Sequence, residues 1–157
     1  MPDPTQFTHK KSLHNLRMFC CAIALTSAVP AQATELLIRV TGIAGDLGRI
    51  GCALFASESG FPMNNAAAAA TSDWLPASGD QMNCHFANVA SGTYAVSVGH
   101  DTNGNLKVDT NFFGMPTEQW GVSNNVRPAL RAPNFDEAKF TVSDDAERLI
   151  MTIEISK

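Results

Sequence analysis

The stretch VASGTYAVSVGH, residues 89–100, is the part of the sequence that indicates the fold most clearly. A turn containing Gly92 leads directly into Thr-Tyr-Ala-Val, where β-branched and aromatic residues favour a strand. A turn that feeds a strand beginning Thr-Tyr is typical of the corner tyrosine of a β-sandwich. We therefore interpret Tyr94 as a structural residue and residues 93–100 as a strand of a sandwich.

Strand signals of the same kind recur along the chain at short spacing. The clearest is RLIMTIEIS (residues 148–156), where apolar and polar side chains alternate so that one face is mostly polar. Further strands are expected at residues 35–43 and 49–57, paired as a hairpin, at 81–89, at 138–143, and as a short edge strand at 73–75. Only residues 64–71, which include five consecutive alanines, are predicted to be helical. Together these segments predict an all-β fold, an antiparallel Ig-like β-sandwich of about seven strands with one short helix.

A long segment, residues 101–134, shows no clear strand or helix pattern. Loops of this length are usually functional or disordered. Its aromatic residues Phe112, Phe113 and Trp120, followed by Phe135, argue against disorder. We expect an ordered loop that packs against one end of the sandwich.

The N-terminal segment has the features of an export signal. Lys10, Lys11 and Arg17 precede an apolar run at residues 18–30, and Ala-Gln-Ala at residues 31–33 matches the small-x-small cleavage rule. The apolar run is shorter than the roughly 20 residues of a membrane span. We predict a signal peptide at 1–33, a single domain at 34–157, periplasmic or secreted localisation, and no membrane span after cleavage. An uncleaved N-terminal anchor is the alternative.

Charge restricts the possible partners of the mature domain. Eight Lys and Arg and fourteen Asp and Glu give residues 34–157 a formal charge of −6, and no Lys/Arg cluster is present. Nucleic acid and anionic membrane surfaces are therefore poor partners, whereas cations are compatible with the domain.

Two cysteines remain after signal removal, Cys52 and Cys84, both in predicted strands. An oxidising compartment favours a disulfide between them. Two buried free thiols are an alternative. A soft-metal site with His85 and His100 is less favoured, because no closely spaced Cys pair would nucleate it.

The sequence HDTNGNLKVDTNFFG (residues 100–114) carries side-chain oxygens at alternating positions. Aligned with an EF-hand loop, the ligand positions are filled by Asp101, Asn103, Asn105, Lys107 through its carbonyl, and Asp109. Leu106 stands where the loop needs Gly, and Phe112 where it needs a bidentate Glu, so this is not an EF-hand. The spacing still predicts a calcium site, to which Glu118 and Asn111 are candidates for further oxygens.

The same residues are equally typical of a loop that binds no ion. Asp and Asn side chains form Asx-turns with their own backbone, and Asn103-Gly104 is a common turn pair. A self-bonded loop is therefore the alternative to calcium.

Enzymatic activity is not expected from the residues that could support it. Ser123, His100 and Asp101 could be arranged as a hydrolase triad, but Gly121-Val-Ser-Asn-Asn lacks the second glycine of a nucleophile elbow. His100 is interpreted as a structural hydrogen-bonding residue.

Three stretches closely resemble a family of exported bacterial proteins, domain-of-unknown-function family 2141: ALFASESGFP, SGTYAVSVGHDTNGNLKVDTNFFGMPTEQWGVSNN and APNFDEAKFTV. The resemblance covers nearly all of the mature chain. It implies a transthyretin-like or carboxypeptidase-regulatory-like sandwich and no established activity. Members typically read Asn-Gly-Asn-Gly in the loop, whereas this chain has Leu106 at the second glycine.

These features predict an exported β-sandwich binding module, whose partner is an unknown envelope protein or a small ligand. The alternative is a ligand-free structural or protein-interaction domain of the cell envelope. A hydrolase that uses His100 and Asp101 is less favoured.

Overall fold

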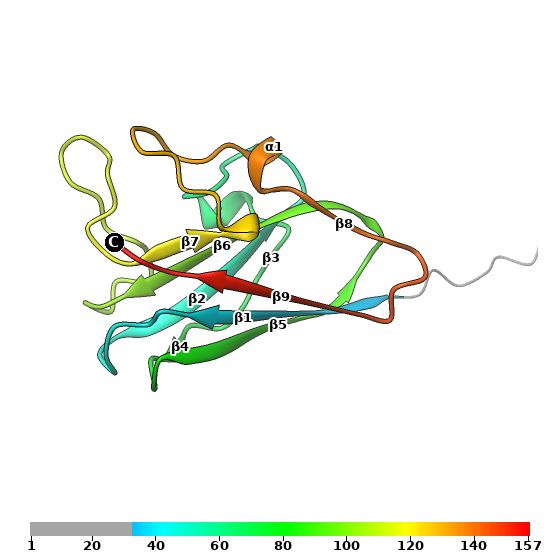
Figure 1. The fold of residues 1–157 in the computed structure, drawn as a ribbon, viewed down its shortest axis with the longest axis horizontal. Helices are drawn as coiled ribbons and strands as arrows, with labels where there is room; N and C mark the ends of the chain where they lie inside the picture. Colours follow the sequence, from blue (N-terminus) through cyan, green and yellow to red (C-terminus); the bar gives the residue numbers. More distant parts are fainter. Residues whose placement is uncertain (1–32) are drawn as a thin grey trace, which may run out of the picture.

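The computed structural model describes residues 33–157, so residues 1–32 of the predicted signal peptide lie outside the described part. Two sheets pack face to face, as the sequence predicted (Figure 1). The smaller has the order β5-β1-β9, from β5 (Gln81–Val89), β1 (Thr34–Thr41) and β9 (Arg148–Glu154). The larger contains β3 (Ala70–Thr71), β2 (Arg49–Phe55), β6 (Gly92–Asp101) and β7 (Trp120–Val122), with β4 (Leu75–Pro76) paired to β2 and β8 (Phe140–Val142) paired to β6.

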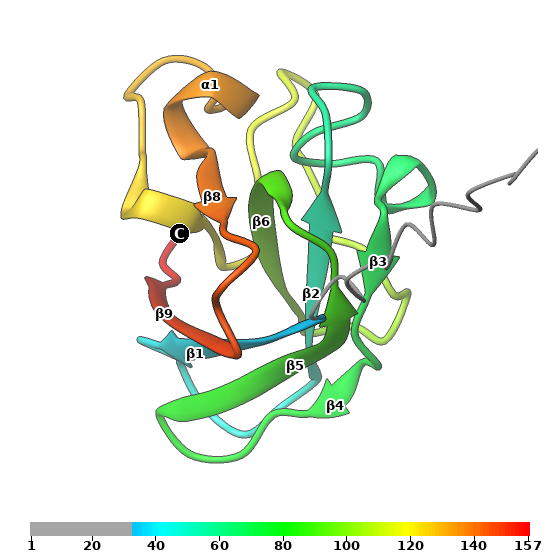
Figure 2. The ribbon, with the colours of Figure 1, turned by 90° about the vertical axis from the view of Figure 1, so that its right-hand side faces the viewer.

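The prediction that the first two strands pair as a hairpin is wrong. β1 is the central strand of the smaller sheet, antiparallel to β5 and parallel to β9, while β2 lies in the larger sheet. The connection between them contains Gly42, Gly45 and Gly48, all with positive φ, and it carries the chain from one sheet to the other. Figure 2 shows the two sets of strands running in different directions.

The core lies between the two sheets. Alternate residues of β1 are fully buried, Leu36, Ile38 and Val40, as the period of a half-buried strand requires. A disulfide joins Cys52 of β2 to Cys84 of β5, with their Cα atoms 6.2 Å apart, and so links the two sheets through the core. The predicted disulfide is confirmed, and the free-thiol and soft-metal alternatives are excluded.

The helix prediction placed the helix in the wrong segment. Residues 64–71 contain only a 3-10 turn, η1 (Asn65–Ala67), after which Ala68 is extended and β3 pairs with β2. Pairing with the sheet therefore overrides the helix propensity of alanine. The short helix is α1 (Phe135–Ala138), where Asn134 and Glu137 form a capping box.

The outer face of the larger sheet carries a second, smaller core. Ala95 and Val122 are buried there against Ala138, with Trp120 and Phe135 packed on them. The long loop is ordered, as expected, but part of it packs on this outer face and not only at one end of the sandwich. It also supplies the unpredicted β7 and the 3-10 turn η2 (Ser123–Asn125).

Phe112 and Phe113 depart from that expectation. They are 97% and 84% exposed, at the end of a turn that extends away from the sheet. Their ring centres lie 5.5 Å apart in an edge-to-face contact. Because both side chains are exposed, they do not attach the loop to the sandwich.

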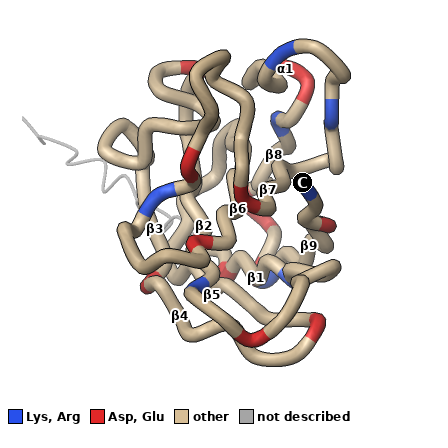
Figure 3. The backbone as a smooth tube through the Cα atoms, turned by 90° about the vertical axis from the view of Figure 1, so that its left-hand side faces the viewer, with Lys and Arg blue, Asp and Glu red and all other residues tan. Residues whose placement is uncertain are grey.

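Along the backbone tube of Figure 3, the Lys and Arg positions are spread over the fold and interspersed with Asp and Glu positions. Within residues 33–157, no helix is long and apolar enough to cross a membrane.

Candidate functional site

The 101–109 loop begins where β6 ends, and Asp101 organises it. The side chain of Asp101 is fully buried under the loop. Its Oδ1 accepts hydrogen bonds from the backbone N–H groups of Asn103, Gly104 and Asn105 at 3.2, 2.7 and 3.2 Å, and its Oδ2 accepts one from Leu106 at 2.7 Å. This carboxylate therefore holds the loop in a closed turn.

The predicted ligands Asn103, Asn105 and Asp109 are brought together by the structure. The side-chain amide of Asn103 donates to Asp109 Oδ2 at 2.6 Å, and that of Asn105 donates to both oxygens at 2.9 and 3.0 Å. The Oδ1 atoms of the two Asn residues accept backbone N–H groups two residues later, so the amide nitrogens are the atoms that face Asp109.

Electrostatics at Asp109 follow from these contacts. Hydrogen bonds from Asn105 and then Asn103 hold the pKa of Asp109 below its usual 3.8, and the charge of Lys107 acts in the same direction. The Lys107 ammonium lies 3.5 Å from Asp109 Oδ1, so the side chain turns toward the predicted ligand residues.

Glu118 closes the loop from the other side. It is buried, its Oε1 accepts from the backbone and hydroxyl of Thr102 at 2.7 and 2.6 Å, and its Oε2 accepts from the backbone of Asp109 at 2.9 Å. Glu118 thus ties the two ends of the loop together. Asn111, the other candidate ligand, instead caps a separate turn by accepting from Phe113 and Met115.

Leu106 stands where members of the family typically have glycine. It has φ +63°, so this position does take the left-handed conformation that glycine adopts most easily. Its N–H is held by Asp101, and its side chain is about half exposed.

Metal ligation is not evident from the side chains alone. Among residues 33–157, no three His, Cys, Asp or Glu side chains are grouped as a metal site. The side-chain oxygens of four predicted ligands, Asp101, Asn103, Asn105 and Asp109, accept hydrogen bonds within the loop.

The residues of the hydrolase alternative have separate structural partners. His100 is buried, with Nδ1 3.0 Å from Gln119 Oε1 and Nε2 2.7 Å from the Leu47 carbonyl. Ser123 is also buried and donates to the Ala138 carbonyl at 2.6 Å. These contacts support the interpretation of His100 as a structural residue.

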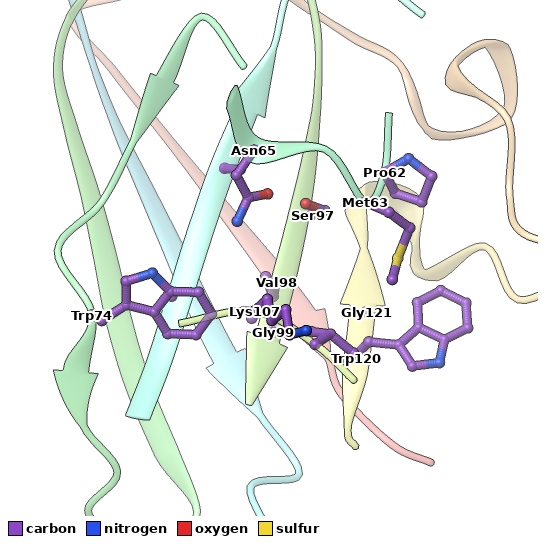
Figure 4. A pocket seen from close by; sticks show the side chains of 13 residues that line it. Pro62, Met63, Asn65, Trp74, Ser97, Val98, Gly99, Lys107, Trp120 and Gly121 are labelled. Carbon is purple, nitrogen blue, oxygen red and sulfur yellow. The ribbon is translucent and has the colours of Figure 1, made fainter. Parts of the chain in front are cut away.

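A shallow pocket lies beside the loop, on the outer face of β2, β6 and β7 (Figure 4). Small residues of β2 and β6 are among those that line it, Gly51, Ala53, Ser97 and Gly99, and Trp74 lies on Gly51 while Val108 lies on Gly99. The chain's two tryptophans, Trp74 and Trp120, stand on opposite sides in Figure 4. Pro62, Met63 and Asn65 line it from the segment before β3.

The 101–109 loop supplies one wall of this pocket through Lys107 and Val108. Val108 lies directly on Gly99, where an added Cβ would come within 2.5 Å of the valine side chain. Only glycine permits this contact, so β6 and the loop are fitted to each other.

Sequence reasoning missed this pocket because its residues come from six separate segments. The available signal was the presence of two tryptophans in a chain of 157 residues, but Trp74 was interpreted only as part of an edge strand.

Comparison with known proteins gives one result. A search of curated proteins and a search of solved structures each found no match. A family model described as "Uncharacterized protein conserved in bacteria" matches residues 38–150, which is most of the chain. The chain therefore belongs to domain-of-unknown-function family 2141 (DUF2141), the family that its motifs resemble.

Proposed function

We propose that this chain is an exported, non-enzymatic β-sandwich module that binds a ligand in the pocket between Trp74 and Trp120. The observation that carries the proposal is the pocket itself, which both tryptophans line together with small residues of β2 and β6. Concave sites with aromatic walls and a few polar groups are the usual form of small-ligand sites.

The contacts of the loop support a binding role more than a catalytic one. Asp101 and His100 are buried, and their polar atoms are hydrogen-bonded within the protein. A general acid or base must reach the substrate, which these two side chains do not do.

Fragment binding tests the proposal. Saturation-transfer NMR with a mixture of small aromatic, aliphatic and sugar compounds should detect binding to the 34–157 protein. Ser97→Leu fills the pocket and should abolish the signal, with the fold checked by circular dichroism. Ile150→Ala on β9 removes a half-exposed apolar side chain from the other sheet, and it should leave the signal unchanged.

Failure of every fragment to bind the unmodified protein would favour the alternative, a ligand-free structural or interaction domain of the envelope. Binding that survives Ser97→Leu would place the ligand elsewhere on the molecule.

A second candidate function is calcium binding by the 101–109 loop, with Asp101, Asn103, Asn105, Lys107 and Asp109 as ligands. The observation that favours it is that Asn103 and Asn105 already converge on the Asp109 carboxylate. A cation would replace the two amide donors if these side chains turned their oxygens inward, at the cost of their bonds to the backbone.

Calcium binding should raise the melting temperature in millimolar calcium relative to chelator, since a ligand of the folded state stabilises it. The increase should be lost in Asp109→Ala and kept in Asp144→Ala, an exposed aspartate on the loop before β9. A melting temperature that is the same with calcium and with chelator would leave the self-bonded loop as the correct description.

A further inference from the structure

The two loops on either side of β7 carry much of the apolar surface that residues 33–157 leave exposed. Phe112 and Phe113 are exposed in the loop before β7, and Leu130, at 94%, in the loop after it. Met115 of the first loop and Met63, from the segment before β3, are 41% and 45% exposed. These five make up more than half of the nine large apolar side chains that are exposed in the described part of the chain. Apolar surface gathered in this way usually marks a contact site.

An apolar hollow lies between the two loops. Residues 114–116 line it from the first loop, four residues between 128 and 133 line it from the second, and Met63 and Trp120 lie against it as well. Figure 1 shows both loops on the same side of the molecule, above β7. The hollow is small, about 50 Å³, so it has room for part of one apolar side chain. The hollow begins directly after Phe113 in the chain, and together with the five exposed side chains it forms one surface, the aromatic face.

Hydrogen bonds hold the turn that carries the two phenylalanines. Asn111 Oδ1 accepts from the backbone N–H groups of Phe113 and Met115, both at 3.0 Å, and the Asn111 N–H donates to the Met115 carbonyl at 2.8 Å. At the base of the loop, the Thr117 N–H donates to the Asp109 carbonyl at 2.8 Å. The backbone of the turn is therefore ordered before any partner arrives, which lowers the entropy lost on binding.

The aromatic face lacks the negative charge that the rest of the domain carries. Residues 110–117 and 126–135 contain no Asp or Glu, although the mature domain has a formal charge of −6. Of the two cations in these segments, Arg131 forms an ion pair and Arg127 lies over an aromatic ring. Copies of an acidic domain repel each other, and they do so least where carboxylates are absent.

The hollow distinguishes between the possible occupants of this face. A lipid surface accepts protruding side chains but offers nothing that fills a hollow, and anionic lipid repels an acidic domain. A second copy of this chain has both parts, because its two phenylalanines protrude beside a hollow of its own. A contact in which two copies exchange the same surfaces is isologous and closes a twofold dimer.

The exposed area is sufficient for such a contact. A large aromatic side chain presents about 150–250 Å², so Phe112 and Phe113, at 97% and 84% exposed, offer roughly 300–400 Å² between them. A standard protein interface covers about 800 Å² on each partner. The aromatic pair alone therefore supplies close to half of that area, and Leu130 and the two methionines add to it.

We infer that this chain forms a twofold dimer through the aromatic face, with the Phe112–Phe113 pair of each copy packed against the hollow of the other. The dimer does not depend on the proposed function, since it uses a different surface and a different kind of partner.

The test measures the mass of the 34–157 protein by sedimentation equilibrium from micromolar to submillimolar concentration, where a monomer–dimer equilibrium is expected. Phe113→Ser should raise the dissociation constant at least tenfold, because central aromatic residues carry much of the energy of a contact. Leu130→Asp should raise it too, because it places a carboxylate of each copy in the contact. The matched control is Ile150→Ser on the outer face of the other sheet, a half-exposed apolar residue, and it should leave the dissociation constant unchanged. All three side chains are exposed, so the core stays intact, and circular dichroism checks the fold.

A protein that stays monomeric at submillimolar concentration would overturn the dimer. So would a dimer whose dissociation constant is unchanged when Phe112→Ser and Phe113→Ser are combined, because the contact would then lie elsewhere. Vesicles of phosphatidylethanolamine and phosphatidylglycerol test the lipid alternative. Co-sedimentation of a monomeric protein with these vesicles, lost in the double variant, would assign the aromatic face to a membrane instead. Ligand binding in the pocket between the tryptophans is tested separately by the fragment experiment.

Discussion

Leu106 is in a backbone conformation that the chain otherwise gives to asparagine or glycine. The other non-glycine residues with positive φ are Asn88, Asn124 and Asn125, within residues 33–157. Asparagine tolerates this region because its short polar side chain bonds locally, whereas leucine has no such compensation.

Leu106→Gly should stabilise the protein. Relief of the left-handed strain is worth about 1–2 kcal/mol, and the greater freedom of glycine in the unfolded chain takes back about 0.5–1 kcal/mol. The side chain is 53% exposed, so little burial is lost. We expect a net gain of roughly 0.5–1 kcal/mol in the free energy of unfolding, measured by urea denaturation.

The matched control is Leu47→Gly, at an exposed leucine that is not among the positive-φ positions. It should destabilise the protein, because only the cost in the unfolded state remains. If Leu106→Gly destabilised the protein as much as this control does, position 106 would not carry the strain.

Among the secondary-structure elements, those with strict alternation were predictable from sequence and the shortest were not. β9 follows from alternating side chains, whose period of two is a local property of the sequence, and β6 follows from the β-branched and aromatic residues after the Gly92 turn. β7 and α1 contain three and four residues, too few to show a period. The pairing of β1 with β9 joins strands from opposite ends of the domain, which no local pattern specifies.

In the candidate site, too, only the residues specified by a local pattern of the sequence were predictable. The loop residues from Asp101 to Asp109 were found because their spacing along the chain is itself the signal. The direction of each side chain was not predictable, since it depends on Glu118 and on backbone bonds that form only in the folded loop. The pocket required Trp74, Lys107 and Trp120 to meet across three segments.

At α1, low pH should weaken the hydrogen bonds of Glu137 that hold the helix to the preceding loop. Glu137 accepts from both Arg131 nitrogens at 2.6 and 2.8 Å and from the backbone of Asn134 at 3.0 Å. These bonds, first from Arg131 and then from Asn134, lower the pKa of Glu137 from 4.5 to about 2. A carboxylate whose pKa is lowered by folding contributes stability above its unfolded pKa, and loses it as the pH falls through the folded one.

We therefore expect the melting temperatures of the unmodified protein and of Glu137→Gln to differ most above pH 4.5 and to converge as the pH approaches 2. Arg131→Gln removes the other partner of this ion pair. Its melting temperature should therefore also converge with that of the unmodified protein as the pH falls. A difference that stays constant over this range would mean that ionisation of Glu137 does not couple to folding.

For the whole molecule, the disulfide is the covalent link between the two sheets. Cys52 and Cys84 are 4% and 2% exposed and are separated by 32 positions, so the bridge closes a loop that contains η1, β3 and β4. In the chain-entropy description, closing a loop of this size stabilises a protein by about 3–4 kcal/mol through the unfolded state. This stabilisation is available only in an oxidising compartment, which agrees with the export that the N-terminal sequence predicts.

Replacing both cysteines by alanine should lower the free energy of unfolding by about 3–4 kcal/mol, measured by urea denaturation. Reduction of the unmodified protein should give a loss of similar size, because both changes open the same loop. The double variant itself should be insensitive to reductant, which separates loss of the bridge from other effects of the reagent. Two titratable thiols in protein purified from the periplasm would contradict the bridge. A double variant as stable as the unmodified protein would show instead that packing of β2 against β5 holds the sheets together without it.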